Sequence, residues 1–266
     1  MTATPDRLAL VGRSGRFTFA ELDAAVDRVC SGLHHLGVEP GDRVAMSLPN
    51  DVDIVIAFLA TMRMGAIWLG INRPLAPAEK AYMLRDAEVS VVLTDPSVGS
   101  SLEPHRADLP DLRELVIVDA GGPGASWRDL CTGAAPWRRE AVIDPLAPAA
   151  IAYTSGTTGV PKGAVHTQHN MLLPGRVNAA RRTTRAGAVL GVALPLTILN
   201  LIVLGPCVAY QGEMTLVAMD RVDGLGMAEW IAAEGITTFS AVPAMVHDLL
   251  TNAAVSEEML ASIESI

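Results

Sequence analysis

The stretch IAYTSGTTGVPKGAVHTQHN, residues 151–170, marks a point where a sheet of this chain opens into a loop. The letters AAIAY have the continuous apolar character of a buried strand, and GAVHT resumes strand character before a helix begins. Between them, residues 154–163 carry four hydroxyl side chains, three glycines and one lysine. The pattern predicts a polar loop that leaves the end of a sheet.

The loop has the composition of an anion-binding segment. Its glycines can adopt backbone angles closed to other residues and expose N–H groups, its hydroxyls are short donors, and its lysine is a point charge. These groups suit a triphosphate, and they are Thr154, Ser155, Gly156, Thr157, Thr158, Gly159, Lys162 and Gly163. The spacing is not that of the common P-loop, because Pro161 precedes the lysine and Gly163 follows it. On composition alone, a Ser/Thr/Gly-rich surface linker remains an alternative.

Alternating helical and strand patterns flank the loop. Apolar spacing predicts a helix over 19–36, opened by a capping box between Thr18 and Glu21, and Asn50 is the predicted cap of a helix over 51–64. Before the loop we also expect strands at 66–71, 89–95 and 114–119 and a helix from 77 to 84. After it we expect a helix at 168–184, strands at 188–194, 214–219 and 236–242, and helices at 199–210, 224–234 and 243–251. This alternation indicates an α/β fold with many parallel strands.

The chain is expected to divide near its middle. Residues 121–148 are rich in glycine, proline and mixed charge, which is typical of a connector. They would separate an N-terminal α/β lobe, residues 1–120, from a second α/β lobe, residues 149–266, that contains the loop at 153–163.

Composition narrows the possible functions. Of the 266 residues, 50% are apolar, and the formal charge of −9 gives no basic footprint for nucleic acid. Cys30, Cys131 and Cys207 have neither disulfide nor zinc-site spacing, so a reducing cytoplasm is the expected location. Residues 187–210 carry no charge. Pro195, Pro206 and the polar Asn200 interrupt them, however, so no membrane span is expected.

A metal pair is a weaker interpretation of one motif. His166 and His169 stand at H-x-x-H spacing beside the loop. Structural metal sites need three or four ligands, and the sequence offers no evident third one nearby. No metal site is therefore predicted.

In its order of residues, the loop resembles the signature of the adenylate-forming (AMP-binding) superfamily, which includes acyl-CoA synthetases, luciferases and nonribosomal-peptide adenylation domains. The similarity extends to PDRLALVGRSGRFTFAELDAAVDRVCSGLHHLGVEPGDRVAMSLPN (5–50), AFLATMRMGAIWLGINRPLAPAEKAYMLRDAEVSVVLTD (57–95) and ITTFSAVPAMVHDLL (236–250). Among the branches, the chain is most similar to carboxylate-CoA ligases of the fatty-acyl type. The resemblance implies the multilayer α/β/α sheets of that family's N-terminal domain.

The resemblance also implies an activity. A carboxylic acid, expected to be a fatty acid, would react with ATP to give an acyl-adenylate and pyrophosphate, and the thiol of coenzyme A would then displace AMP. ATP, Mg²⁺ and coenzyme A are the implied cofactors, and the loop would hold the β- and γ-phosphates. The implied acyl pocket is bordered by Pro195, Thr197, Ile198, Asn200, Val242 and Pro243.

The chain departs from the family pattern in two places. After Pro-Leu the family usually has an aromatic residue and a histidine, where this chain has Thr197 and Ile198, so the acid that it prefers is open. The chain also ends before the family's adenine and ribose motifs, its hinge and its C-terminal domain, whose lysine is the catalytic one. Lys162 belongs to the loop and does not replace that lysine.

These departures leave an alternative open. The chain would then be a truncated, catalytically inactive paralogue or gene fragment, acting at most as a nucleotide-binding or interaction module. A sheet edge and apolar surface left uncovered by such a truncation would favour association.

Overall fold

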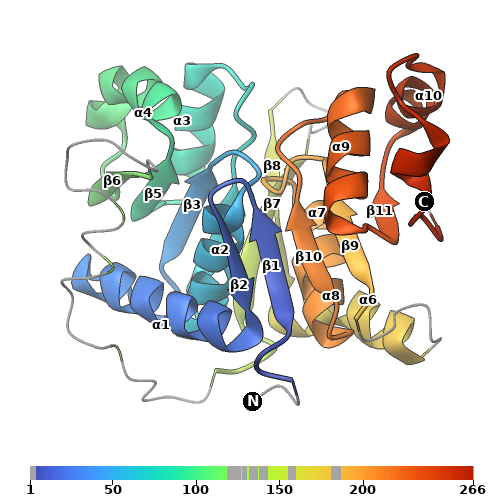
Figure 1. Ribbon diagram of the computed structural model, residues 1–266. Coiled ribbons are helices and arrows are strands. Elements are labelled where there is room, and N and C mark those ends of the chain that lie inside the picture. The colour runs from blue at the N-terminus through green and yellow to red at the C-terminus, as the bar shows by residue number, and fades with distance from the viewer. Residues whose placement is uncertain are drawn as a thin grey trace.

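Two sheets organise the chain in the computed structural model, which describes residues 4–118, 127, 131, 137, 143–154, 160–180 and 187–265 (Figure 1). The first has six strands in the order β6-β5-β3-β4-β7-β8. All its pairs are parallel except β7 with β8. Its strands are β3 (Arg43–Ser47), β4 (Ile67–Gly70), β5 (Val91–Thr94), β6 (Glu114–Ile117), β7 (Pro148–Thr154) and β8 (Lys162–Thr167).

The second sheet has five strands in the order β11-β9-β10-β1-β2. Here too one pair is antiparallel, β1 with β2, and the others are parallel. The strands are β1 (Leu8–Gly12), β2 (Gly15–Thr18), β9 (Val189–Val192), β10 (Thr215–Ala218) and β11 (Thr238–Ser240). Each sheet therefore ends in one antiparallel hairpin.

Helices fill the spaces around and between the sheets. Before residue 120 they are α1 (Phe19–His35), α2 (Val52–Met64), α3 (Pro77–Asp86), α4 (Pro96–Leu102) and the 3₁₀ turn η1 (Glu103–Asp108). After residue 148 they are α6 (Gln168–Ala180), α7 (Leu199–Ile202), the π-helical turn η2 (Val203–Cys207), α8 (Val208–Gln211), α9 (Gly224–Glu234), α10 (Pro243–Thr251) and the 3₁₀ turn η3 (Glu257–Leu260).

The buried side chains show how these layers are stacked. The largest core cluster combines α1 and α2 with residues of both sheets, such as Met46 of β3 and Leu216 of β10. Successive residues of a strand point to opposite faces. Ala45 and Leu69 therefore pack on the outer side with α3 and α4, while on the other sheet Val217 packs outward with α9 and α10. The predicted multilayer α/β/α fold is confirmed.

Each sheet takes strands from both sides of residues 121–148. The hairpin β1–β2 belongs to the five-stranded sheet, whose other strands all follow residue 188, while β7–β8 belongs to the six-stranded sheet, whose other strands all precede residue 118. The division into lobes 1–120 and 149–266 stays a prediction.

Most predicted elements form, and the strands predicted at 66–71, 89–95, 188–194, 214–219 and 236–242 are shorter by one or two residues at each end. Helices 224–234 and 243–251 have the predicted bounds, and the capping box of Thr18 and Glu21 is present in full. The predicted helix 168–184 is described as far as Ala180, and the rest lies outside the described residues. The predicted helix 199–210 is helical throughout but contains the π turn η2 at Pro206, since proline lacks the N–H of a regular turn.

One predicted cap is wrong. Asp51, not Asn50, is the N-cap of α2, because the Asp51 carboxylate accepts a hydrogen bond from the Val52 N–H at 2.8 Å. Asn50 lies one residue earlier and bonds instead to the far sheet. In the part of the chain that the structure describes, no helix is long and apolar enough to cross a membrane.

Candidate functional site

The β7–β8 hairpin presents the predicted loop at one end of the six-stranded sheet. Its last cross-strand pair is Thr154 with Lys162, so the two ends of the loop face each other. Both of these residues are exposed, whereas residues 155–159 lie outside the described residues. The predicted loop residues Thr154, Lys162 and Gly163 therefore lie together, and the predicted roles of Ser155, Gly156, Thr157, Thr158 and Gly159 stay predictions.

Neighbouring residues hold the base of this hairpin. The Tyr82 hydroxyl of α3 donates to the Pro161 carbonyl at 3.2 Å. The Tyr153 hydroxyl donates to the Asp86 carboxylate at 2.5 Å and to the Met83 carbonyl at 3.4 Å. Burial, and then the contact with Asp86, raises the pKa of Tyr153 well above its ordinary value, so the phenol stays protonated as the donor. The loop thus starts and ends on fixed positions against α3.

The chain has two lysines, and they lie in opposite surroundings. Lys80 is 3% exposed and its ammonium donates to the carbonyls of Arg73 and Leu75. Burial lowers the pKa of Lys80. Lys162 is exposed beside the loop, with no ion pair to a described residue. Lys162 is therefore the lysine available to a ligand.

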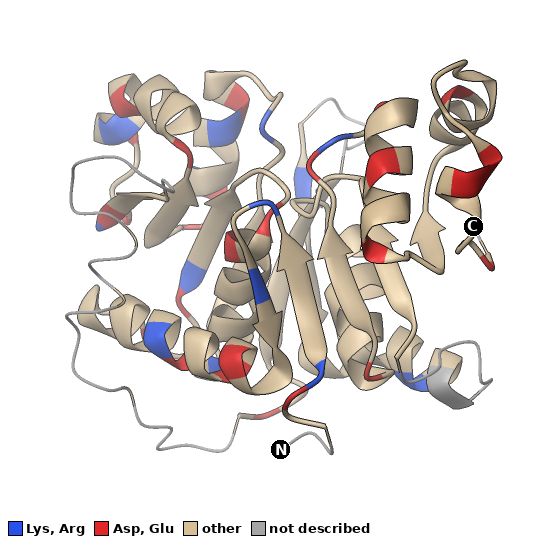
Figure 2. Ribbon diagram, in the orientation of Figure 1, with Lys and Arg blue, Asp and Glu red and all other residues tan. Residues whose placement is uncertain are grey.

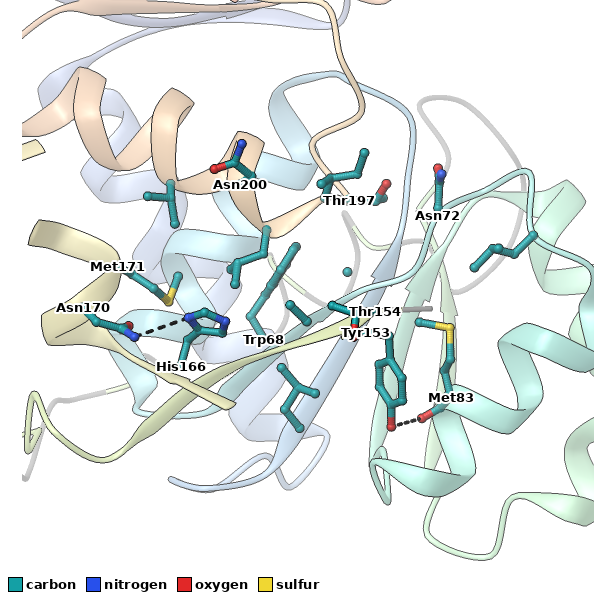
Figure 3. A pocket seen from close by; sticks show the side chains of 17 residues that line it. Trp68, Asn72, Met83, Tyr153, Thr154, His166, Asn170, Met171, Thr197 and Asn200 are labelled. Atoms are coloured by element: carbon teal, nitrogen blue, oxygen red, sulfur yellow. Dashed lines mark hydrogen bonds between the residues drawn. The ribbon is translucent and has the colours of Figure 1, made fainter. Parts of the chain in front are cut away.

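A cavity of about 680 Å³ opens where β4 and β7 end (Figure 3). The carboxyl ends of parallel strands meet at one edge of a sheet, which is where α/β folds commonly bind ligands. Residues of β7 and β8 form part of its wall, α6 another part, and the turn before α7 a third. The lining residues are Trp68, Gly70, Asn72, Leu75, Met83, Ile151, Ala152, Tyr153, Thr154, His166, Asn170, Met171, Thr197, Ile198, Leu199, Asn200 and Val203.

Half of the predicted acyl pocket falls on this cavity. Thr197, Ile198 and Asn200 line it. Pro195 is not among the described lining residues, although its carbonyl accepts from the Ile198 N–H at 3.0 Å and so shapes the turn. Val242 and Pro243 stand at the start of α10, outside the described lining. The pocket roles of all six residues stay predictions.

Asn50 fixes the segment that carries Thr197 and Ile198. Its side-chain amide donates to the Leu194 carbonyl at 2.9 Å and its amide oxygen accepts from the Leu196 N–H at 2.8 Å. The same amide nitrogen lies 3.2 Å from the Met219 carbonyl, beyond the end of β10. Asn50 thus joins the loop after β3 to the ends of β9 and β10, and so positions one wall of the cavity from the other sheet.

Sequence reasoning missed several wall residues. Trp68 lies in an apolar strand, and such a pattern predicts a core residue. It is fully buried in the structure, but it also lines the cavity. His166 and Asn170 line it as a pair, with the Asn170 amide nitrogen 3.4 Å from His166 Nδ1 (Figure 3). His166 lies on β8 and Asn170 on α6, so helical spacing does not relate them, and nothing in the sequence relates Trp68 to residue 197.

The H-x-x-H motif does not act as a unit here. His166 lies on β8 at the cavity, whereas His169 is exposed and its backbone N–H donates to the Pro145 carbonyl at 2.9 Å. Across the described residues, no group of three or more His, Cys, Asp or Glu side chains is placed to hold a metal ion.

The surface charge is mixed. Lys and Arg are scattered among Asp and Glu over the described elements (Figure 2). Most arginines of the described residues have acidic partners, as in the pairs Arg63–Asp27 at 2.6 Å and Arg16–Glu234 at 2.7 Å. An anionic ligand would therefore depend on local donors rather than on a basic surface.

The arrangement of two sheets, with a glycine- and hydroxyl-rich hairpin loop beside a cavity, defines an α/β fold found in acid-activating ligases. The anthranilate CoA ligase AuaEII, in complex with anthranoyl-AMP, has this fold, with a TM-score of 0.91 at 23% identity over 99% of this chain and 52% of that one. ATP-bound MatB from Rhodopseudomonas palustris superposes with a TM-score of 0.87 at 27% identity, over 100% of this chain and 52% of that one.

The chain belongs to the AMP-binding enzyme family, whose sequence model matches residues 1–265. It is 31% identical to a salicyl-AMP ligase/salicyl-S-ArCP synthetase of Mycobacterium tuberculosis, over 91% of this chain and 45% of that protein. It is 32% identical to a long-chain-fatty-acid–CoA ligase of Thermus thermophilus, over 87% of this chain and 43% of that protein. The chain spans about half the length of the curated relatives that it matches.

Proposed function

We propose that this chain supplies the phosphate loop and the acid pocket of an AMP-forming carboxylate ligase. The observation that carries the proposal is the position of Thr154. This residue ends β7, begins the loop, pairs with Lys162 and lines the 680 Å³ cavity. A triphosphate on the loop and an acid in the cavity would therefore meet at one residue.

The proposed reaction has two steps. An oxygen of the carboxylate attacks the α-phosphorus of ATP, the bond to pyrophosphate breaks, and an acyl-adenylate forms. In the second step the thiol of coenzyme A attacks the acyl carbon and AMP leaves. Such chemistry depends chiefly on positioning and on neutralising charge.

The described residues suit the first of these tasks. The Thr154 hydroxyl and the Lys162 ammonium would donate to phosphate oxygens, and charge-assisted hydrogen bonds of this kind are the stronger ones. Tyr82 and Tyr153 would keep the two ends of the loop in place against α3. Lys162 would neutralise charge on the β- and γ-phosphates, as the sequence pattern predicts.

Among the described residues, no group of three or more His, Cys, Asp or Glu side chains is placed to hold Mg²⁺ by itself. Mg²⁺ is commonly held by phosphates, water and one or two carboxylates.

The names of the relatives limit the substrate only to a broad class of acids. They include ligases of salicylate, long-chain fatty acids, 4-coumarate and 3-hydroxybenzoate. A carboxylic acid is their common substrate class, and a fatty acid is one member of it. Transfer to coenzyme A is part of the proposal, because the salicyl-AMP ligase is named for transfer to a carrier protein instead.

The test combines nucleotide binding and pyrophosphate release. We expect Lys162→Ala to weaken ATP binding by the 266-residue chain about ten- to a hundredfold, since it removes a charge-assisted contact. Arg106→Ala, which removes one cation from η1, is the matched control and should leave the affinity unchanged. Calorimetry with ATP and Mg²⁺ measures both.

Pyrophosphate release in the presence of a panel of acids then separates activity from binding alone. Release that depends on Lys162 would support the ligase. Binding that depends on Lys162 without any release would favour the alternative of an inactive nucleotide-binding module. An ATP affinity that Lys162→Ala does not change would disprove the role of the loop.

A further inference from the structure

A second cavity, of about 250 Å³, lies among α2, α6, η2 and α8. Its wall is mostly apolar, with Phe58 and Met62 contributed by α2 and Pro206 and Cys207 contributed by η2. Apolar walls favour an apolar occupant, because both lose contact with water when they meet. The proposed ligase reaction gives this cavity no role of its own.

The second cavity has no charged side chain among its described lining residues. Burial raises the pKa of the Cys207 thiol to about 12 and the pKa of the Tyr210 phenol well above its ordinary value, so both stay protonated. The amide nitrogens of Gln168 and Gln211 already donate to the Met62 carbonyl at 2.8 Å and the Cys207 carbonyl at 2.9 Å. A carboxylate placed here would lose its hydration without gaining a cation. The cavity therefore suits a hydrocarbon segment and not the ionised end of an acid.

Met171 of α6 lies between the second cavity and the candidate site. Among the described lining residues, it is the one that the second cavity shares with the 680 Å³ cavity. Figure 3 shows it on the side of the larger cavity that holds His166 and Asn170, apart from Thr154. Met171 is only 2% exposed. At this point a single buried residue therefore belongs to both walls.

We propose that Met171 sets the upper length of the acid by closing the candidate cavity against the second cavity. This inference rests on the proposed function, in which the carboxylate lies near Thr154 and the rest of the acid extends into the 680 Å³ cavity. An unbranched acid that reaches Met171 meets its thioether side chain, and beyond it lies uncharged space that can accept methylene groups. The volume of one side chain thus decides whether a longer acid can use the second cavity.

The test measures how acid affinity depends on chain length. Straight-chain acids from butanoate to tetradecanoate are titrated by calorimetry into the 266-residue chain without nucleotide. Each buried methylene should tighten binding about fourfold, so affinity rises with length and stops rising where the acid meets Met171. In Met171→Ala we expect the rise to continue over about two further methylenes, which is about a tenfold gain for the longest acids. The affinity for short acids should not change.

Three further variants separate side-chain volume from other effects. Met171→Leu keeps nearly the same volume and should keep the wild-type length limit. Met227→Ala makes the same truncation at a buried residue of α9, outside the described lining of both cavities, and should leave the limit unchanged. If circular dichroism shows that Met171→Ala does not fold, Met171→Val removes less volume and should move the limit in the same direction.

A double variant assigns the added space to the second cavity. Cys207 is a described lining residue of the second cavity and not of the first. Cys207→Phe places a larger side chain on that wall and should leave acid binding by the otherwise wild-type chain unchanged. Combined with Met171→Ala, it should restore the wild-type limit. A limit that stays extended in the double variant would show that the longer acids go elsewhere, and would overturn the inference.

The remaining outcomes distinguish this inference from the proposed function. An unchanged limit in Met171→Ala, or an equal gain for short and long acids, contradicts the role of Met171 alone. No binding of any acid by any variant contradicts both that role and the proposed acid pocket. Since ATP is absent, failure of pyrophosphate release would count against the proposed ligase reaction and not against the length limit.

Discussion

A β-hairpin that leads directly into a helix occurs twice in the described residues, once outside the cavity lining and once at the candidate site. The hairpin β1–β2 and the hairpin β7–β8 each form the antiparallel end of an otherwise parallel sheet. Each runs directly into a helix, α1 or α6. At the start of each helix, a threonine and the residue three positions later exchange hydrogen bonds, since each side chain accepts from the other residue's backbone N–H. The pairs are Thr18 with Glu21 and Thr167 with Asn170.

The two turns differ in length and in what fixes them. Gly12 pairs with Gly15, so only Arg13 and Ser14 form the first turn. The Ser14 N–H donates to the Asp51 carboxylate at 3.1 Å, and Arg13 forms an ion pair with Asp220. In the second hairpin, residues 155–161 separate Thr154 from Lys162, and the first four residues of β8 are exposed. The first turn is thus short and tied to its neighbours, whereas the second is longer and joins strand ends that are exposed at Thr154 and Lys162.

The capping pairs differ in the same way. Within the part of the chain that the structure describes, Glu21 bonds only in its cap, where its carboxylate accepts from the Thr18 N–H at 2.8 Å. Asn170 closes its cap and also faces the cavity beside His166. The second hairpin therefore differs from the first in its longer turn and in a cap residue, Asn170, that also lines the cavity.

The largest effect should come from making the second hairpin like the first. Because Thr154 and Lys162 are a register pair, an Asn-Gly turn can replace residues 155–161 without moving either strand. We expect the fold to persist and ATP affinity to fall by on the order of a hundredfold or more, as several donors are lost together. Circular dichroism and calorimetry measure the two properties.

The reciprocal change provides the control for that experiment. Inserting residues 155–161 between Arg13 and Ser14 lengthens the first hairpin and should create no ATP affinity there. A shortened second hairpin that still binds ATP normally would show that the loop is not the phosphate site.

A smaller effect, on stability alone, is expected at the tight hairpin. Asp51→Ala removes the N-cap of α2 and the acceptor of the Ser14 N–H. Losing such a cap costs about 1 kcal/mol of the free energy of unfolding. Denaturant unfolding measures this cost, with the exposed Asp111→Ala as control. ATP affinity should not change, and a loss of ATP binding in Asp51→Ala would mean that the two hairpins are coupled.

The sequence predicted most of the elements, because helix starts and apolar periodicity are local signals. Thr18 with Glu21 and the bounds of α9 and α10 are examples. It did not predict β1 and β2. These strands have only five and four residues, and the turn between them, Arg13 and Ser14, is not one of the Asn-Gly or Asp-Gly pairs that indicate a hairpin. It assigned the wrong cap at Asn50, because Asn and Asp are equally good caps locally and only the carbonyls of the distant sheet distinguish them.

The candidate site was predictable where its residues are consecutive and unpredictable where they are not. The loop residues follow one another in the sequence, so their shared chemistry was visible. Trp68 and the Thr197 carbonyl both lie close to Gly70 because the turn after β9 packs against β4, and no pattern of neighbours in the sequence indicates this.

The smallest expected effect is a difference between the two helix caps in how their contribution to stability depends on pH. The hydrogen bond from the Thr18 N–H holds the pKa of Glu21 below its ordinary value. A lowered carboxyl pKa means that the contribution to stability is complete above the unfolded-state pKa of about 4.3 and is lost as pH falls through the folded-state pKa. The Tm difference between the wild-type chain and Glu21→Gln should therefore be small at neutral pH, and it should shrink as pH falls below the unfolded-state pKa and disappear once pH has passed the lowered folded-state pKa. The cap of Thr167 uses the neutral Asn170, so the Tm cost of Thr167→Ala should stay constant over the same range. If both costs faded together, general acid unfolding rather than the Glu21 cap would be responsible.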